Sequence, residues 1–244
     1  MGAREQGGGS VLMSKTQERS LAGVEMLCAL DEDARKALEQ RCHWQVYSAG
    51  EEIIGWQEAS DDIYFLIDGS ARVAIYSGSG KLVGFHQIEP GDPFGEFAAI
   101  DGQPRSANVE AAAECLVARM SSQLFWSTLE KEPAVVAALL KRLVAQIRSL
   151  TTRVFEFSTL AVSNRIQAEL LRLARDNGID DNTALITPAP THTEIASRIS
   201  THREAVTREL SRLTQNNVIR REGRALCVTD VDRLARMVQE ATGD

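Results

Sequence analysis

The pattern of apolar and polar positions changes twice along this chain. Between Trp44 and Met120, apolar residues stand in short alternating runs that are separated by turns such as Asp68-Gly69. Runs of this kind predict the short strands of a β-sandwich or barrel. The expected strands are residues 52–54, 63–67, 71–76, 82–85 and 113–118.

On both sides of this region apolar residues recur every three or four positions, which is the period of a helix. Residues 21–41, 122–129 and 163–174 are expected to be helical. Pro133 begins a much longer helical pattern of about seven turns. Its apolar positions are Val136, Leu139, Leu140, Leu143, Ile147, Leu150, Val154 and Phe157.

A helix this long carries more apolar surface than one small barrel can cover. Pairing with the same helix of a second chain would bury the remainder, so we expect a homodimer. The alternative is a helix that packs only within its own chain. Residues 176–190 contain Asn, Asp, Gly and Pro at turn positions and are expected to form a loop.

Two sequences typical of helix N-termini stand ten residues apart in the C-terminal third of the chain. Thr191 to Glu194 opens a helix expected to end near Arg198, and Thr201 to Glu204 opens one expected to end near Gln215. Each sequence is a capping box, in which the Thr and Glu side chains cap each other's backbone N–H groups. Two short helices joined by a tight turn predict a helix-turn-helix.

The second of these helices has two chemically different sides. One side is apolar and should face the domain core, whereas the other is polar. Arg side chains near the start of such a helix can bind guanine in the major groove, and Glu can accept from cytosine. The alternative is an ordinary surface pair between Glu204 and Arg208. The predicted DNA-binding residues are Thr191, His192, Thr193, His202, Arg203, Glu204, Thr207 and Arg208.

Residues 218–228 predict a β-hairpin that turns at Glu222-Gly223, and its arginines can contact phosphates. The net charge of −7 at first argues against a polyanionic partner, but the charge is uneven. Residues 1–159 hold 15 Lys+Arg against 22 Asp+Glu, whereas residues 191–224 hold seven Arg against four Glu. This local basic region is compatible with double-stranded DNA as a partner.

The composition, with 43% hydrophobic and 25% charged residues, is that of an ordinary soluble protein. No apolar run is long enough to span a bilayer, so a cytoplasmic protein without a membrane partner is expected. Residues 1–20 are polar and rich in glycine, and they are expected to be mobile. The cysteines at 28, 42, 115 and 227 are scattered, which predicts buried free thiols and no metal site.

One stretch carries the clearest chemistry. Gly95-Glu96 and Arg105-Ser106 stand ten residues apart, with a small apolar turn between them. An Arg suits a phosphate and a Glu suits a sugar hydroxyl, so together they suit a 3′,5′-cyclic nucleotide, whose 2′-OH is free. The alternative is a structural ion pair between Glu96 and Arg105. By strand alternation, Ile67, Val73 and Phe85 are expected to line the cavity.

The stretch from Phe94 to Ala107 resembles the phosphate-binding cassette of cyclic-nucleotide-binding domains, F-G-E-x-A-x(6)-R-[STA]-A. With the helix-turn-helix, the resemblance extends over roughly residues 25 to 230 to the Crp–Fnr superfamily of bacterial transcription regulators. The Arg203-Glu204 and Arg208 arrangement resembles the recognition helix of its Crp-like branch. That resemblance implies an inverted pair of half-sites with a GTGA core, and RNA polymerase as a further partner.

The resemblance also implies the ligand contacts. In the family's best-known bacterial member, a Thr-Ser pair on the long helix meets the purine, one residue from each subunit. The matching positions here are Leu150 and Thr151, so the identity of the base stays open. Family frequency favours cAMP, with cGMP as the alternative. The predicted effector-binding residues are Gly95, Glu96, Phe97, Arg105, Ser106, Leu150 and Thr151.

The expected fold is α+β. A β-roll of the jelly-roll kind covers residues 21–132, a dimerisation helix covers 133–159, and a winged helix-turn-helix covers 160–244. We expect an allosteric regulator and not an enzyme, because the chain has no nucleophile–base set, phosphate loop or zinc-protease motif. The alternative is a regulator of the same fold that responds to haem, to redox change or to no ligand.

Overall fold

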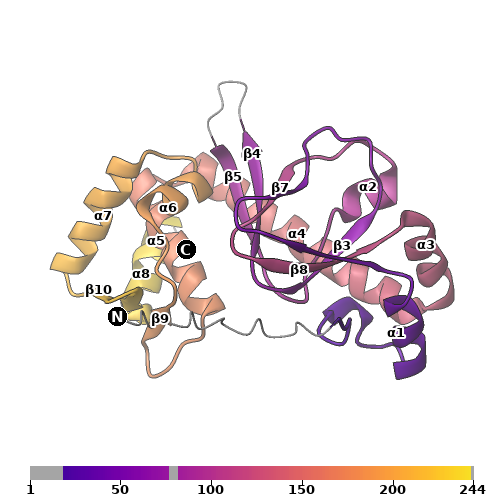
Figure 1. The fold of residues 1–244 in the computed structure, drawn as a ribbon. Coiled ribbons are helices and arrows are strands. Elements are labelled where there is room, and N and C mark those ends of the chain that lie inside the picture. The colour runs from indigo at the N-terminus through magenta and orange to yellow at the C-terminus, as the bar shows by residue number, and fades with distance from the viewer. Residues whose placement is uncertain (1–18, 77–81, 243–244) are drawn as a thin grey trace, which may run out of the picture.

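The computed structural model describes residues 19–76 and 82–242. Apart from its last two residues, the segment 1–20 that is expected to be mobile lies outside the described residues. The described chain forms a β-roll, a long helix and a smaller C-terminal domain (Figure 1). This arrangement confirms the predicted α+β fold. No helix in these ranges is both long and apolar enough to cross a bilayer.

Two antiparallel four-stranded sheets make up the β-roll in the described part of the chain. The first has the order β1 (His43–Tyr47), β8 (Cys115–Met120), β3 (Ile63–Asp68) and β6 (Pro93–Phe94). The second has the order β2 (Glu52–Ile54), β7 (Asn108–Ala111), β4 (Ala71–Tyr76) and β5 (Leu82–Ile88). The sequence pattern missed β1, β6 and β7. β1 leaves most of its side chains exposed, and the other two strands are very short.

Strand β3 explains how the β-roll is packed on two sides. Tyr64 and Leu66 point between the two sheets, whereas Ile63 and Phe65 point to a second cluster beneath the helices. Because both faces are covered, the strand is a continuous apolar run instead of an alternating one. The helices over the second cluster are η1 (Glu25–Leu27), α1 (Glu32–Glu39), α3 (Ser122–Lys131) and the first part of α4 (Pro133–Thr159).

The single helix expected over residues 21–41 is wrong, because η1 and α1 are separate elements. The break falls at Asp31, whose backbone is extended and whose carboxylate accepts from Ala34 N at 2.7 Å. A short acidic side chain of this kind favours a helix N-cap over a helix interior. Residues 21–30 therefore enter α1 through a turn.

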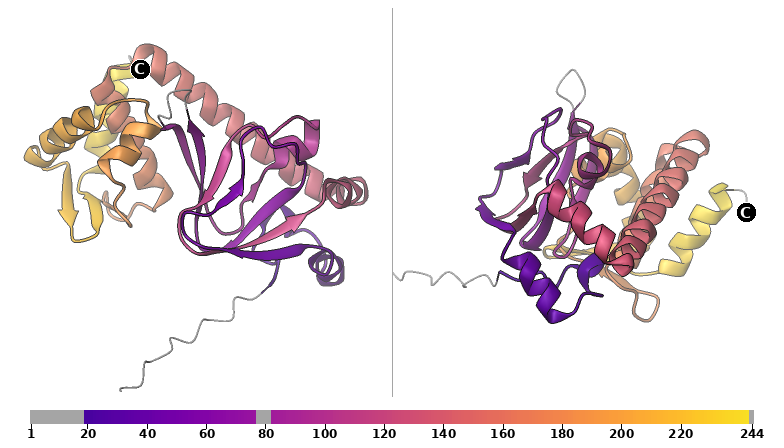
Figure 2. Two further views of the ribbon diagram at one scale, coloured as in Figure 1. Left: turned by 45° about the horizontal axis from the view of Figure 1, so that its top comes forward. Right: turned by 90° about the vertical axis from the view of Figure 1, so that its right-hand side faces the viewer.

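Helix α4 connects the two ends of the molecule. It runs from beside α3, along the β-roll, to the C-terminal domain (Figures 1 and 2). It ends where Leu160 becomes extended, and α5 (Val162–Asp176) follows at once. Two side chains of α5 hold the ends of these helices together. Arg172 donates to Glu156 of α4 at 2.9 Å, and Arg165 lies 4.5 Å above the ring of Phe157.

The C-terminal domain packs α5, α6 (His192–Arg198), α7 (Arg203–Gln215) and α8 (Val231–Thr242) against a three-stranded sheet of order β10-β11-β9. The hairpin of β10 (Ile219–Glu222) and β11 (Ala225–Val228) confirms the predicted one. Strand β9 (Ala184–Ile186) corrects the expected loop over 176–190, and α8 was not predicted. Three residues are too few to show an alternating pattern, although Ala184 and Ile186 are buried.

The cysteines follow the expectation only in part. Cys42 and Cys115 are buried, and burial raises the pKa of these thiols to about 12 and about 11. Cys28 is exposed and Cys227 is half-buried, so the prediction that all four are buried is wrong. Cys28 follows the last residue of η1, and the apolar side chains that precede it fill the core positions instead.

Candidate ligand pocket and nucleic-acid interface

The pocket begins at α2 (Glu96–Asp101), directly after strand β6. Gly95 starts this helix with a positive φ of 76°, a conformation that glycine adopts without strain. A Cβ atom at this position would stand only 2.8 Å from Nη1 of Arg105. Glycine at position 95 therefore allows the guanidinium to lie against the backbone at the start of α2.

Arg105 is held in place by the chain itself. Its side chain is almost fully buried, and it donates from Nε to Ser60 Oγ at 2.9 Å. Its two terminal nitrogens each donate to a backbone carbonyl at 2.8 Å, that of Gly95 and that of Asp62. A guanidinium carries five N–H groups, so one remains on each terminal nitrogen. These remaining donors suit a phosphate oxygen in the cavity.

Glu96 is the acidic partner across the same cavity, and only 6% of it is exposed. Burial raises the pKa of its carboxyl group above the usual range, while the nearby Arg142 and a hydrogen bond with Gln146 oppose that shift. Among the described residues no ion pair joins Glu96 to Arg105, so the structural ion pair is not observed. The carboxylate accepts from its own backbone N–H and from Gln146, and its remaining lone pairs can accept from a hydroxyl donor.

The cavity between these residues has a volume of about 440 Å³. Of the predicted effector residues, it brings together Gly95, Glu96, Phe97, Arg105, Ser106 and Leu150. Thr151 does not line the cavity of its own chain. It is exposed, and its hydroxyl donates to Ile147 O at 2.9 Å. Val73 lines the cavity as expected, Ile67 packs beneath the helices instead, and the side chain of Phe85 lies outside the described structure.

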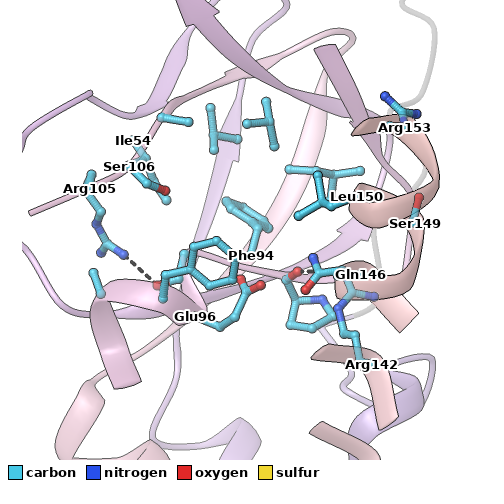
Figure 3. Close-up of a pocket in the computed structure, with 18 residues that line it drawn as sticks. Ile54, Phe94, Glu96, Arg105, Ser106, Arg142, Gln146, Ser149, Leu150 and Arg153 are labelled. Carbon is cyan, nitrogen blue, oxygen red and sulfur yellow. Dashed lines mark hydrogen bonds between the residues drawn. The ribbon is translucent and has the colours of Figure 1, made fainter. Parts of the chain in front are cut away.

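Helix α4 forms a whole wall of the pocket, of which the sequence analysis predicted only Leu150. Figure 3 shows this wall facing Arg105 and Ser106 across the cavity. Its polar members recur at helical spacing among apolar positions, and this spacing is the signal that could have identified them. The wall consists of Arg142, Gln146, Ser149, Leu150 and Arg153.

Two polar atoms of this wall are buried without a hydrogen-bond partner in the described structure, Oε1 of Gln146 and Nε of Arg142. The rest of the Arg142 guanidinium is tied down, because it donates to Asp92 at 2.8 Å and to Pro93 O at 3.2 Å. A buried polar atom that lacks a partner is costly, so a polar ligand beside these atoms would stabilise the site.

A second candidate site lies on α6 and α7. The predicted capping box at Thr191 is confirmed: its hydroxyl accepts from Glu194 N at 3.2 Å, and the Glu194 carboxylate accepts from Thr191 N at 2.6 Å. The second predicted box is wrong. The N-cap of α7 is His202, whose side chain makes no capping hydrogen bond. Thr201 precedes the N-cap by one residue, because its backbone N–H donates to Ala196 O and keeps it in the turn after α6.

Helix α7 presents the two sides that the pattern predicts. Val206, Leu210 and Leu213 are buried, whereas the predicted DNA-binding side chains of the helix are exposed. Within the described structure, no pair joins Glu204 to Arg208, so both remain available for other contacts. The exposed predicted residues of this helix are Arg203, Glu204, Thr207 and Arg208.

The start of α6 is attached to this exposed side of α7. Nδ1 of the half-buried His192 lies 2.8 Å from Oγ1 of Thr207, which itself donates to Arg203 O at 3.0 Å. Burial lowers the pKa of His192, and the charges of Arg203 and of Arg221 on β10 act in the same direction. Cationic groups of α7 and of the hairpin therefore lie close to the His192 ring at the start of α6. Thr193, the next residue of α6, is exposed as well.

The back of α7 is held by a buried polar contact. The carboxylate of Glu209 accepts from Gln167 of α5 at 2.7 Å and from Arg212 at 2.7 Å. This contact fixes the orientation of the helix, so that its exposed side chains project from a rigid support. A helix-turn-helix followed by a hairpin is the geometry that places a helix in the major groove and arginines near phosphates.

These features define a class: a DNA-binding protein whose helix-turn-helix is joined by one helix to a small-molecule pocket. The cyclic nucleotide-binding domain family matches residues 44–132, and the Crp-like helix-turn-helix domain family matches residues 164–237. The chain belongs to the Crp–Fnr superfamily of transcription regulators, in its Crp-like branch.

Known proteins agree with this placement. The chain is 25% identical to a CRP-like cAMP-activated global transcriptional regulator of Mycobacterium tuberculosis, over 88% of this chain and 97% of the relative. It is 28% identical to the cAMP-activated global transcriptional regulator CRP of Salmonella typhimurium, over 77% and 90%. A CooA mutant from Carboxydothermus hydrogenoformans has the same fold, with a TM-score of 0.76 and 17% identity over 88% and 95% of the two chains.

Proposed function

We propose that this protein is a homodimeric transcription regulator whose affinity for its operator is set by a 3′,5′-cyclic purine nucleotide, cAMP or cGMP. The observation that carries this proposal is the shared cavity of Glu96, Arg105 and helix α4, because α4 leads directly to the DNA-binding domain. Relatives described as cAMP-activated support an effector of this chemical class.

In this proposal the cyclic phosphate accepts from the remaining N–H groups of Arg105 and from Ser106. The ribose 2′-OH donates to Glu96, and Phe97 and Leu150 cover the apolar faces of the ligand. By family resemblance Thr151 reaches the ligand of the partner subunit, which is compatible with its position outside the cavity of its own chain. The β-roll of residues 21–132, the helix of 133–159 and the DNA-binding domain of 160–244 act as three units.

Ligand binding reaches DNA through the dimer axis. The bound nucleotide contacts α4, and the pairs Arg172–Glu156 and Arg165–Phe157 attach the end of α4 to α5. A change in how the two α4 helices pack therefore turns both DNA-binding domains. Coupling of this kind requires that the nucleotide bind one dimer state more tightly than the other.

On DNA, four side chains around the turn contact phosphates and so position the domain: Thr191, His192, Thr193 and His202. Three side chains of α7 contact bases. These are Arg203, Glu204 and Arg208, and by family resemblance they select a GTGA core repeated as an inverted pair. Two half-sites about 34 Å apart match successive major grooves on one face of the duplex. The regulator acts in the cytoplasm, with RNA polymerase as its partner at promoters.

The substitution Arg203→Ala tests the DNA contact. We expect a loss of about 1–3 kcal/mol of binding free energy on the best GTGA site, because a bidentate contact to guanine is removed. Binding to a scrambled duplex should change far less. Fluorescence anisotropy with both duplexes measures the difference, and Arg175→Ala, an exposed charge at the end of α5, is the matched control. Equal weakening on both duplexes would make Arg203 a phosphate contact.

A further inference from the structure

The pocket has two ends that differ in their chemistry. The end formed by Arg105, Ser106 and Glu96 suits a phosphate and a ribose. Figure 3 shows Arg153 on the other side of the cavity, on α4 and beside Leu150. A nucleotide anchored by its phosphate at Arg105 therefore extends its base toward the α4 wall.

Arg153 is a free cation at that wall. It lines the cavity and is half-buried, yet it has no hydrogen bond or ion pair with any described residue. The other arginine of the wall, Arg142, is already bound to Asp92 and Pro93 O. Arg153 lies seven residues beyond Gln146, or about 10 Å further along the helix axis. It therefore lines the cavity further along α4 than Arg142 and Gln146, the residues beside Glu96.

The purine bases differ in what they present to a guanidinium. Guanine offers two neighbouring acceptors, O6 and N7, which a planar fork of N–H donors can fill together. Adenine offers N7 beside an N6 amino group, so one donor of the fork would face another donor. Arginine has no acceptor that could satisfy this amino group. A free arginine at the base end consequently favours a 6-oxopurine.

We propose that Arg153 is the specificity-determining residue of the pocket and that it selects cGMP over cAMP by donating to O6 and N7. This inference rests on the proposed function, since it assigns the base within the same nucleotide site. The assignment of cGMP differs from the sequence-based expectation, which favours cAMP as the more frequent effector of the family. Leu150 contributes no polar group to the base, and the hydroxyl of Thr151 can donate or accept and so suits either purine. The discrimination therefore falls to Arg153.

Calorimetric titration of the purified full-length protein with cGMP, cAMP and cIMP tests the proposal. We expect cGMP to bind at least about tenfold more tightly than cAMP, the discrimination of a good bidentate contact. cIMP lacks the 2-amino group but keeps O6 and N7, the two acceptors that the guanidinium contacts. Its affinity should therefore lie within about threefold of that of cGMP.

Two substitutions separate base recognition from simple charge. Arg153→Met should lower the affinity for cGMP about tenfold or more, because the guanine contact is lost. The affinity for cAMP should stay within about threefold of that of the unmodified protein. Arg153→Lys keeps the charge but not the planar fork, so the preference for cGMP should also disappear. Arg148→Met, at an exposed position of the same helix outside the cavity, should bind both nucleotides as the unmodified protein does.

A preference of the unmodified protein for cAMP would overturn the assignment, and so would equal weakening of both nucleotides by Arg153→Met. Either result would leave the cyclic-nucleotide site itself intact. Binding of none of the three nucleotides would instead contradict the proposed function. Thermal unfolding of each variant, with a midpoint like that of the unmodified protein, ensures that a loss of binding is not a loss of folding.

Discussion

Arg105→Ala is expected to remove cyclic-nucleotide binding, with a loss of at least about a hundredfold in affinity. The almost fully buried guanidinium supplies the charge that the cyclic phosphate needs, and hydrogen bonds to charged groups contribute about 1.5–3 kcal/mol each. Two N–H groups of this side chain remain for the ligand. Calorimetry with cAMP and cGMP measures the change.

The same substitution also affects the protein without ligand. Arg105 supports Gly95 O, Asp62 O and Ser60 Oγ, so its loss leaves buried acceptors unpaired and should lower the unfolding midpoint as well. Arg72→Ala is the matched control, since Arg72 pairs with Glu110 on the β-roll and does not line the cavity. Retention of full nucleotide affinity by Arg105→Ala would show that the phosphate binds elsewhere.

Ile147→Glu is expected to produce a monomer that no longer binds an operator at physiological salt. Large apolar side chains of α4 are exposed along one side in the single chain, and a monomer rarely shows such a continuous apolar surface. Their exposed fractions run from 44% for Phe157 to 65% for Val154. Two carboxylates facing each other across a dimer axis would cost several kcal/mol, so we expect the dimer dissociation constant to rise about a hundredfold or more.

Sedimentation velocity over a range of protein concentrations measures this change. The matched control is Val46→Glu, because Val46 is 52% exposed on β1, away from α4, and receives the same new charge. The control should sediment as the unmodified protein does. A stable dimer of Ile147→Glu at low micromolar concentration would mean that the apolar surface of α4 is covered in some other way.

Features that depend on neighbouring residues were visible in the sequence. The cap of α6 by Thr191 and Glu194 is local chemistry, and the apolar period after Pro133 gave α4 because it extends over many turns. The Gly95-Glu96 and Arg105-Ser106 pairs also meet as expected. They stand ten residues apart, and a short helix between them returns the chain to one cavity.

Features that depend on tertiary packing were not visible. Arg142, Gln146 and Arg153 enter the pocket only because α4 packs along the β-roll, and nothing within the helix itself requires this. The capping box predicted at Thr201 does not form, for a related reason. Its sequence fits a capping box, but the turn after α6 places His202 at the start of α7 instead. Tertiary geometry thus decided between two equally acceptable local signals.

The central claim is that a cyclic nucleotide in the β-roll controls the binding of DNA by α7. Fluorescence anisotropy with a labelled duplex carrying two inverted GTGA half-sites, measured with no nucleotide, with cAMP and with cGMP, tests this claim most directly. We predict that one of the nucleotides raises the operator affinity at least about tenfold, which is within the usual range of allosteric coupling. An operator affinity that is the same with and without saturating nucleotide would contradict the account.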